Sequence, residues 1–299
     1  MPPARPAPSP ATSLGLGDDR PCAGAALLGA GGDPRRRDSP ALIHRGRTIS
    51  HGELAERVAQ RAREFGPGRR VVMIAGANEP EVLISHLAAL SGGHVSRPVP
   101  SPAQADELRR RFAPDTLGNP QGDGVAIHHL TRRATHRLHP DLALLAGTSG
   151  STGAPRLVRL SHTNITANAA AIATYLNLDH TERAITSLPM HYCYGLSVVH
   201  SHLLVGASLV LSDRSVSDPA FWGLVRENGV TSLAGVPHTF ALLEQAGFAD
   251  LDLPSLRYLT QAGGRMDPGR GRRLAAPGAT PGWGVGGVYG QTEATAPRG

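Results

Sequence analysis

The segment with the clearest chemical signal is a run of glycines and hydroxyl side chains between two apolar stretches. From residue 145 to residue 162 it reads LAGTSGSTGAPRLVRLSH. Backbone N–H groups and hydroxyls in such a loop can converge on one anion, and glycine lets the backbone approach a phosphate closely. A flexible linker would not normally connect two apolar strands. The segment therefore predicts a phosphate-binding loop made of Thr148, Ser149, Gly150, Ser151, Thr152 and Gly153.

Two familiar motifs do not fit this loop. A nucleotide-binding P-loop requires the pattern GxxxxGK[ST], but Gly147 and Gly153 are six residues apart and no lysine follows. A hydrolase nucleophile elbow requires GxSxG, but Ser149 is followed by Ser151 where the second glycine should stand. These mismatches disfavour a P-loop kinase and an α/β-hydrolase.

The charge of the chain comes entirely from arginine. The sequence has 30 basic residues and no lysine, and its formal net charge is +6. Any mechanism that needs a lysine of this chain, such as a Schiff base, is therefore excluded. The arginines are scattered and aromatic residues make up only 4% of the chain, so no stacking platform for nucleic acid is expected. The histidines do not follow zinc-binding spacing.

The loop resembles the phosphate-binding signature of the adenylate-forming superfamily. This superfamily comprises acyl- and aryl-CoA synthetases, luciferases and the adenylation domains of non-ribosomal peptide synthetases. Arg156 stands where the family usually has a lysine. Other family landmarks occur in the family's order, namely TISHGEL at 48–54, LPMHYCYGL at 188–196, AGG at 262–264 and VYGQTE at 288–293.

The resemblance implies a reaction and a role for each matching position. A carboxylate would attack the α-phosphorus of ATP and give acyl-AMP and pyrophosphate, with Mg²⁺ as cofactor and CoA as one candidate acceptor. Thr292 and Glu293 would be catalytic, the first by hydrogen-bonding the α-phosphate and the second by holding Mg²⁺. Tyr289 would stack on adenine. The remaining implied contacts are Gly263, Gly264, Gly290 and Gln291 to the nucleotide, Thr148–Gly153 and Arg156 to the β- and γ-phosphates, and His191, Tyr192 and Gly195 to the acyl pocket.

The sequence departs from the family after the VYGQTE segment. Relatives continue with an aspartate, an arginine and a small lid domain that supplies a lysine, whereas this sequence has six residues after Glu293. We therefore expect residues 39–299 to form part of the large AMP-binding domain without the lid. Such a chain would form acyl-AMP slowly at most and no acyl-CoA, unless a carrier protein or a separate lid chain is its partner. The alternative is an inactive nucleotide-binding remnant or interaction subunit.

The acyl pocket segment contains no acidic residue. Amino-acid-activating relatives place an aspartate near this segment, but residues 187–212 have neither Asp nor Glu. An unpaired substrate ammonium would be costly to bury there. The sequence therefore favours a fatty or aryl carboxylic acid as the substrate.

Short β-rich runs alternate with helical patterns from residue 40 onward. The pattern predicts an α/β fold with doubly wound, mostly parallel sheets in two subdomains, joined by a polar linker at about 114–140. Asn78 is expected to cap a helix that contains Pro80. Residues 1–38 are expected to be a disordered Pro/Ala/Arg-rich extension, and no apolar run is long enough for a membrane span. Two distant cysteines, Cys22 and Cys193, indicate a reducing cytoplasm.

Overall fold

Two β-sheets form the frame of the protein. The computed structural model describes residues 22–148, 156–265, 267, 269, 284–287 and 292. The first sheet has the strand order β13 (Gly284–Gly287), β12 (Tyr258–Gln261), β11 (Ser232–Gly235), β9 (Arg183–Ile185), β10 (Ser208–Val210), β1 (Pro40–His44) and β2 (Arg47–Ser50). The second has the order β6 (Gly124–His129), β5 (Thr116–Gln121), β3 (Val71–Ala75), β4 (Val95–Val99), β7 (Leu142–Gly147) and β8 (Leu157–Ser161).

Most neighbouring strands in both sheets are parallel. The antiparallel pairs are β1–β2, β5–β6 and β7–β8. Parallel neighbours need crossover connections, and the helices that supply them lie on the faces of the sheets. The predicted α/β class with mostly parallel sheets in two subdomains is therefore confirmed.

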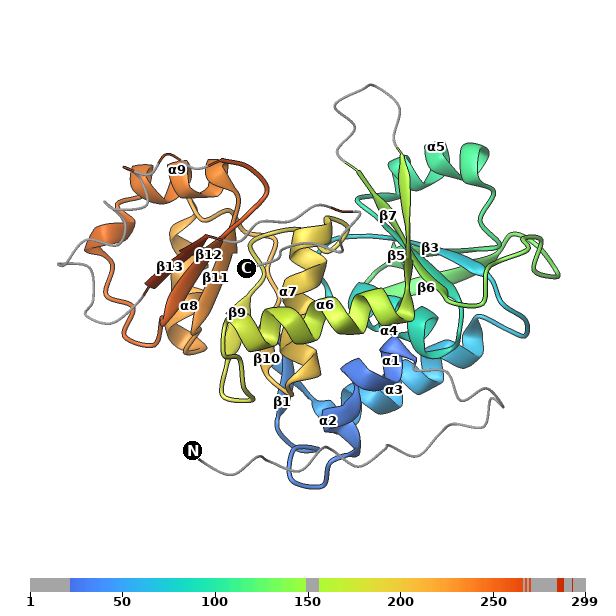
Figure 1. Ribbon diagram of the computed structural model, residues 1–299, viewed down its shortest axis with the longest axis horizontal. Coiled ribbons are helices and arrows are strands. Elements are labelled where there is room, and N and C mark those ends of the chain that lie inside the picture. Colours follow the sequence, from blue (N-terminus) through green and yellow to red (C-terminus); the bar gives the residue numbers. More distant parts are fainter. Residues whose placement is uncertain are drawn as a thin grey trace.

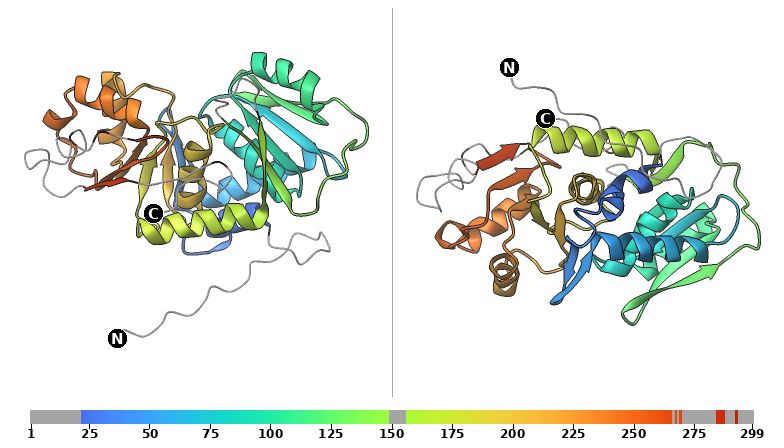
Figure 2. Two further views of the ribbon diagram at one scale, coloured as in Figure 1. Left: turned by 45° about the horizontal axis from the view of Figure 1, so that its top comes forward. Right: turned by 90° about the horizontal axis from the view of Figure 1, so that it is seen from below.

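Helices separate and flank the two sheets, as Figure 1 shows. They are α1 (Ala23–Leu27), α2 (Gly29–Gly32), α3 (His51–Glu64), α4 (Pro80–Ser91), α5 (Pro102–Phe112), α6 (His162–Tyr175), α7 (Cys193–Leu204), α8 (Pro219–Glu227), α9 (Pro237–Gln245) and the 3₁₀ turn η1 (Phe248–Asp250). α6 runs across the molecule from one sheet toward the other (Figure 2). Its first turn carries a capping box, because Ser161 and Asn164 each accept a hydrogen bond from the other's backbone N–H.

Two segments differ from the sequence-based expectations. Residues 114–140, expected to link two subdomains, instead contain the β5–β6 hairpin at one edge of the six-stranded sheet. Residues 22–38, expected to belong to a disordered extension, contain α1 and α2, and Ala23 and Leu27 are fully buried. Both segments are rich in small or polar residues, so their apolar contacts come from distant parts of the chain.

The main core lies between the sheets and is built on α4 and α7. α4 buries every residue from Val82 to Leu90, which is typical of a helix enclosed on all sides. α7 packs on β9 and β10, whereas α4 packs on β3 and β4. A second core on the seven-stranded sheet contains Phe221, Trp222 and Phe248, and the Trp222 ring contacts the rings of both phenylalanines.

A pair of buried histidines joins the two central helices. His86 of α4 and His200 of α7 are stacked with ring centroids 5.2 Å apart, and their Nε2 atoms are 3.0 Å apart. The Nδ1 of His86 lies 2.8 Å from the Ser96 hydroxyl on β4. Burial lowers the pKa of His86 to about 4 and the pKa of His200 well below its usual value, so both rings are neutral near pH 7. One neutral Nε2 can then donate to the other.

We predict that this histidine pair makes the fold sensitive to mild acid. The unfolded chain, in which His86 has its ordinary pKa of 6.5, binds more protons than the folded chain between about pH 6.5 and pH 4. The free energy of unfolding should therefore fall as the pH is lowered through this window. His86→Gln should reduce that slope, by up to about 1.4 kcal/mol per pH unit. Urea unfolding at a series of pH values between pH 7 and pH 4.5 measures how the free energy of unfolding depends on pH.

The exposed residue His139 provides the control for this measurement. His139→Gln removes a histidine at the surface and leaves the stacked pair in place, so it separates the effect of the pair from the effect of losing any histidine. An unchanged slope in His86→Gln would contradict the prediction.

Candidate functional site

The candidate residues follow the carboxyl ends of strands in both sheets. The glycine-rich loop follows β7, residues 188–195 follow β9, and the turn with Gly263 and Gly264 follows β12. In open parallel sheets, ligands bind in the crevice outside these carboxyl ends. The topology therefore gathers the segments that the sequence analysis selected from distant parts of the chain.

The pocket segment, defined here as residues 188–195, is held in place by Asn78. The buried Asn78 amide donates to the Leu188 carbonyl (3.2 Å) and to the Ser212 carbonyl (3.1 Å), and its Oδ1 accepts from the Met190 N–H (3.0 Å). Asn78 follows β3 of the six-stranded sheet, whereas its partners follow β9 and β10 of the seven-stranded sheet. One side chain thus ties the pocket segment to both sheets.

Asn78 does not cap α4, contrary to the sequence-based expectation. The N-cap residue is Glu79, which makes no side-chain capping hydrogen bond, and Pro80 occupies the first turn. Proline needs no partner for its nitrogen, so the start of this helix tolerates the lack of a side-chain cap. The amide of Asn78 is therefore available for the pocket segment.

Glycine is required where the pocket segment turns into α7. A Cβ atom on Gly195 would lie 2.4 Å from the Pro189 carbonyl oxygen, which is a backbone atom that cannot rotate away. Tyr192 precedes the first residue of α7, and its N–H donates to the same carbonyl at 3.0 Å. The turn therefore directs Tyr192 toward the turn after β12.

The turn after β12 meets Tyr192 directly. Gly263 has φ +77°, and a Cβ atom built on it would lie 2.6 Å from the Tyr192 hydroxyl oxygen. The buried amide of Gln261 holds this turn by donating to the carbonyls of Ala262 (3.1 Å) and Gly264 (2.8 Å). Glycine at 263 therefore permits both the backbone conformation and the close approach of the tyrosine.

Thr292 lies beside the start of α7. Its Oγ1 is 3.4 Å from the Cys193 sulfur. The C-terminal motif therefore reaches the pocket segment at this position. The other predicted nucleotide contacts of that motif, Tyr289, Gly290, Gln291 and Glu293, lie outside the described residues.

The base of the glycine-rich loop is closed by backbone contacts. The Thr148 N–H donates to the Arg156 carbonyl at 3.1 Å, and its hydroxyl donates to the same oxygen at 3.4 Å. Arg156 is exposed, as a group that meets a solvent-borne phosphate would be. Ser149, Gly150, Ser151, Thr152 and Gly153 lie outside the described residues.

An arginine that the sequence analysis missed lies next to this loop. Arg97 of β4 is 6% exposed, and its Nη1 and Nη2 atoms are each 3.3 Å from the Cβ position of Gly147. Burial lowers the pKa of His191, and the positive charge of Arg97 lowers it further. An arginine inside the otherwise uncharged strand Val95–Val99 was the sequence signal that could have identified it.

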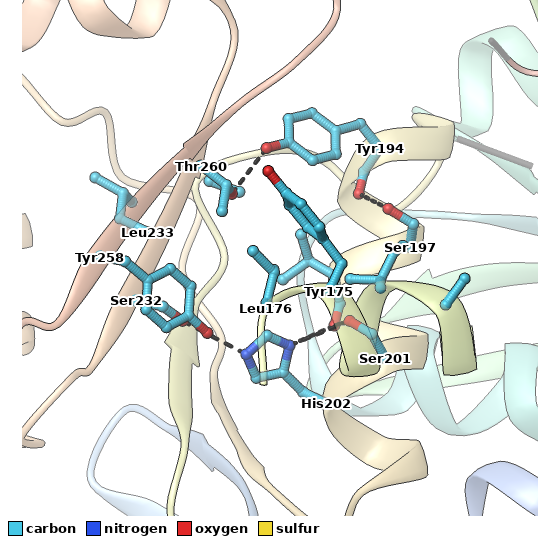
Figure 3. Close-up of a pocket in the computed structure, with 14 residues that line it drawn as sticks. Tyr175, Leu176, Tyr194, Ser197, Ser201, His202, Ser232, Leu233, Tyr258 and Thr260 are labelled. Carbon is cyan, nitrogen blue, oxygen red and sulfur yellow. Dashed lines mark hydrogen bonds between the residues drawn. The ribbon is translucent and has the colours of Figure 1, made fainter. Parts of the chain in front are cut away.

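A small cavity lies between α6, α7 and the strands β11 and β12 (Figure 3). Its volume is about 40 Å³. The Tyr194 hydroxyl donates to Thr260 at 2.8 Å, and His202, whose pKa is lowered by burial, lies 3.4 Å from Ser232. The described residues that line the cavity include no Asp or Glu.

The buried carboxylate of Glu182, which precedes β9, is already compensated within the described part of the chain. Glu182 is 6% exposed, and its Oε1 is 2.7 Å from the Arg257 guanidinium. Its other oxygen accepts a hydrogen bond from the Thr231 hydroxyl. Glu182 therefore has little remaining capacity to pair with a cationic ligand.

The described regions contain neither a cluster of metal-ligating side chains nor a membrane-spanning helix. No three His, Cys, Asp or Glu side chains among the residues with described positions are grouped to hold a metal ion. No helix in the described parts of the chain has the length and apolar character of a membrane span.

Comparison with known proteins gives a consistent family assignment. A family model described as AMP-binding enzyme matches residues 114–297. Feruloyl-CoA synthase of Amycolatopsis sp is 31% identical over 267 residues, which cover 77% of this chain and 52% of the relative. Tyrocidine synthase 2 of Brevibacillus parabrevis is 28% identical over 253 residues, which cover 75% of this chain and 7% of that protein. The chain thus spans about half the length of the first relative and a small part of the second.

A solved structure shares the fold. The N-terminal subdomain of Klebsiella oxytoca NpsA in complex with 3-hydroxyanthranilyl-AMSN matches with a TM-score of 0.72 and 23% identity. The match covers 92% of this chain and 74% of that chain.

We predict that Asn78→Asp destabilises the pocket segment. The variant keeps the size of the side chain but replaces the amide donor with an oxygen, so two buried carbonyls lose their partner and face a carboxylate. Each unsatisfied buried group costs about 1–3 kcal/mol. The midpoint of urea unfolding should fall, and amide hydrogen exchange of residues 188–195 should accelerate. The exposed residue Gln104 supplies the control, because Gln104→Glu makes the same chemical change at the surface and should alter neither quantity.

Proposed function

Because the chain belongs to the AMP-binding enzyme family, we propose that it activates a carboxylic acid with ATP to give an acyl adenylate and pyrophosphate. The family match spans residues 114–297 and includes the glycine-rich loop, the pocket segment and the C-terminal motif. The proposal rests chiefly on the meeting of the pocket segment, the Gly263 turn and Thr292 at the start of α7. Tyr192 touches the Gly263 turn, and Thr292 lies 3.4 Å from Cys193.

The reaction places specific demands on the residues of the chain. A carboxylate oxygen attacks the α-phosphorus, a P–O bond forms, and the bond to the β-phosphate oxygen breaks with its electron pair leaving on pyrophosphate. The Thr292 hydroxyl would donate to an α-phosphate oxygen, where negative charge accumulates. Thr148, Arg156 and the loop between them would bind the leaving phosphates. Tyr289, with Gly290 and Gln291, would bind the adenine.

The Glu293 carboxylate would hold the Mg²⁺ ion that offsets the negative charge of the phosphates. A carboxylate is a hard oxygen ligand of the type that Mg²⁺ prefers, and the bound ion would neutralise phosphate charge. The described residues around the loop fit an anionic ligand, because Arg97 and Arg156 are near it. Holding the reactants in line supplies the remaining acceleration.

The cavity beside Tyr194 would receive the acyl or aryl group of the substrate, and its lining favours an uncharged group. Its described lining has no carboxylate to pair with a substrate ammonium. An apolar cavity of about 150 Å³ holds benzene, so a cavity of about 40 Å³ has to widen before it accepts an aromatic ring. Tyr175, 51% exposed, borders the cavity, and an outward rotation of its ring would widen it.

The acceptor of the acyl group is proposed on the comparisons. The similarity to a feruloyl-CoA synthase favours CoA, and a carrier-protein thiol or a separate lid chain remains a candidate partner.

Cys22 and Cys193 are not joined in a disulfide, which supports a reducing compartment such as the cytoplasm.

We predict ATP–pyrophosphate exchange that depends on an added acid. Aryl and fatty acids should support faster exchange than amino acids, by about tenfold or more, because an unpaired ammonium in the cavity costs more than about 1.4 kcal/mol. Thr292→Val, which removes only the hydroxyl, should slow the exchange by about 10²-fold. Thr174→Val, the same change on the exposed side of α6, should leave it unaltered.

Two results would contradict the proposal. Preference for a zwitterionic amino acid would overturn the substrate class. Stabilisation by ATP without exchange, for every acid in the panel, would favour the inactive nucleotide-binding remnant.

A further inference from the structure

Arg97 is a buried guanidinium that lacks a charged partner in the described part of the protein. Its Nη1 donates to the carbonyls of Pro98 (3.3 Å) and Leu145 (3.2 Å). Among the described residues its Nε has no hydrogen-bond partner, and the ion pairs between described side chains do not include Arg97. Both of the hydrogen bonds that the guanidinium makes to described carbonyls come from Nη1. The two carbonyls hold one edge of the guanidinium and leave the other edge uncommitted.

This arrangement has a cost in the free protein. A buried charge without a counter-charge is unfavourable, and two backbone dipoles compensate it only in part. Burial lowers the pKa of Arg97 to about 10, so the group nevertheless stays charged at neutral pH. A strand that needed only packing would carry an apolar side chain here, as Met73 does at the paired position on β3.

A second buried arginine in the same sheet provides a comparison. Arg70, which precedes β3, is 3% exposed and also has an unpartnered Nε. Its Nη1 and Nη2, however, donate to the carbonyls of Thr131 (3.1 Å) and Arg132 (3.0 Å). Both terminal nitrogens of Arg70 thus donate to backbone carbonyls, whereas only Nη1 of Arg97 does so.

The position of Arg97 indicates which kind of ligand could supply the missing counter-charge of its guanidinium. The guanidinium lies against Gly147, the last residue of β7, at the carboxyl end of two parallel strands. A Cβ atom on Gly147 would lie 3.3 Å from both Nη atoms, so glycine at this position lets the guanidinium pack closely at the start of the loop. Thr148 and the exposed residue Arg156 follow directly. Arg97 does not line the cavity beside Tyr194, which lies against the other sheet.

We propose that Arg97 binds the oligophosphate of the reaction, the triphosphate tail of ATP and the pyrophosphate product, through the uncommitted edge of its guanidinium. The inference rests on the proposed function and adds a phosphate-binding residue to that same site. A guanidinium fork matches two phosphate oxygens at once, which a lysine ammonium cannot do. The phosphate supplies the counter-charge that Arg97 lacks in the free protein.

The proposal predicts opposite effects of one substitution on the free and the bound protein. Arg97→Met removes the buried charge and keeps most of the volume. Without ligand, its thermal midpoint should equal or exceed that of the unmodified chain. Stabilisation by pyrophosphate, measured as the midpoint shift over a concentration series with Mg²⁺, should require about tenfold to hundredfold more pyrophosphate. Arg97→Gln, which can still donate to one carbonyl, should show the same loss.

Arg70→Met is the matched control. It removes a buried arginine at the opposite end of the same sheet, so it should lower the midpoint without ligand and leave the pyrophosphate requirement unchanged. A purely structural Arg97 would behave in the same way. That result for Arg97→Met and Arg97→Gln would overturn the inference and leave the proposed function standing. Absence of any pyrophosphate or ATP shift in the unmodified chain would overturn both.

Discussion

The hydrogen bonds of the Asn78 side chain are the constraint on which the arrangement of the site depends. Its amide reaches backbone groups at the ends of two strands in the seven-stranded sheet, while its own backbone belongs to a connection of the six-stranded sheet. A buried backbone group that loses its partner is expensive, so the lowest free energy is reached only when both sheets present their ends to this one residue. The pocket segment therefore has its position fixed by the packing of the whole domain.

The interior between the sheets contains hydrogen-bonded polar groups as well as apolar ones. His86, His200 and Ser96 form a chain of contacts across α4, α7 and β4. Apolar side chains could fill the same space, but hydrogen bonds are directional, so these contacts restrict how the two helices can pack more than apolar contacts alone would. Because α7 begins with the pocket segment, a fixed register for α7 also fixes Tyr192 against the Gly263 turn.

The fold could be predicted from the sequence wherever the pattern is local, and the site only in part. Residues 71–75 are an apolar run and Ser161 is a favoured N-cap residue, so the local sequence is typical of the strand and of the helix start that the structure has there. The β5–β6 hairpin is polar and is stabilised by the pairing of β5 with β3. The β-propensity of its residues does not reveal this pairing with another strand. An asparagine before a proline-led helix is typical of a cap, so local pattern assigns Asn78 wrongly. Its partner Leu188 is 110 residues away, and interactions of that range carry no local signal.

The absence of lysine gives the position of Arg97 its significance. In a chain whose only permanent cations are guanidinium groups, charge can be placed at a phosphate only by a large, planar side chain that needs several acceptors. One carbonyl of β4 and one of β7 hold that plane, which removes much of the conformational entropy that a flexible surface arginine would lose on binding. The cost is an incompletely paired charge in the free protein. Stability and affinity are then linked at one residue, since the interaction that the fold lacks is the one that the ligand supplies.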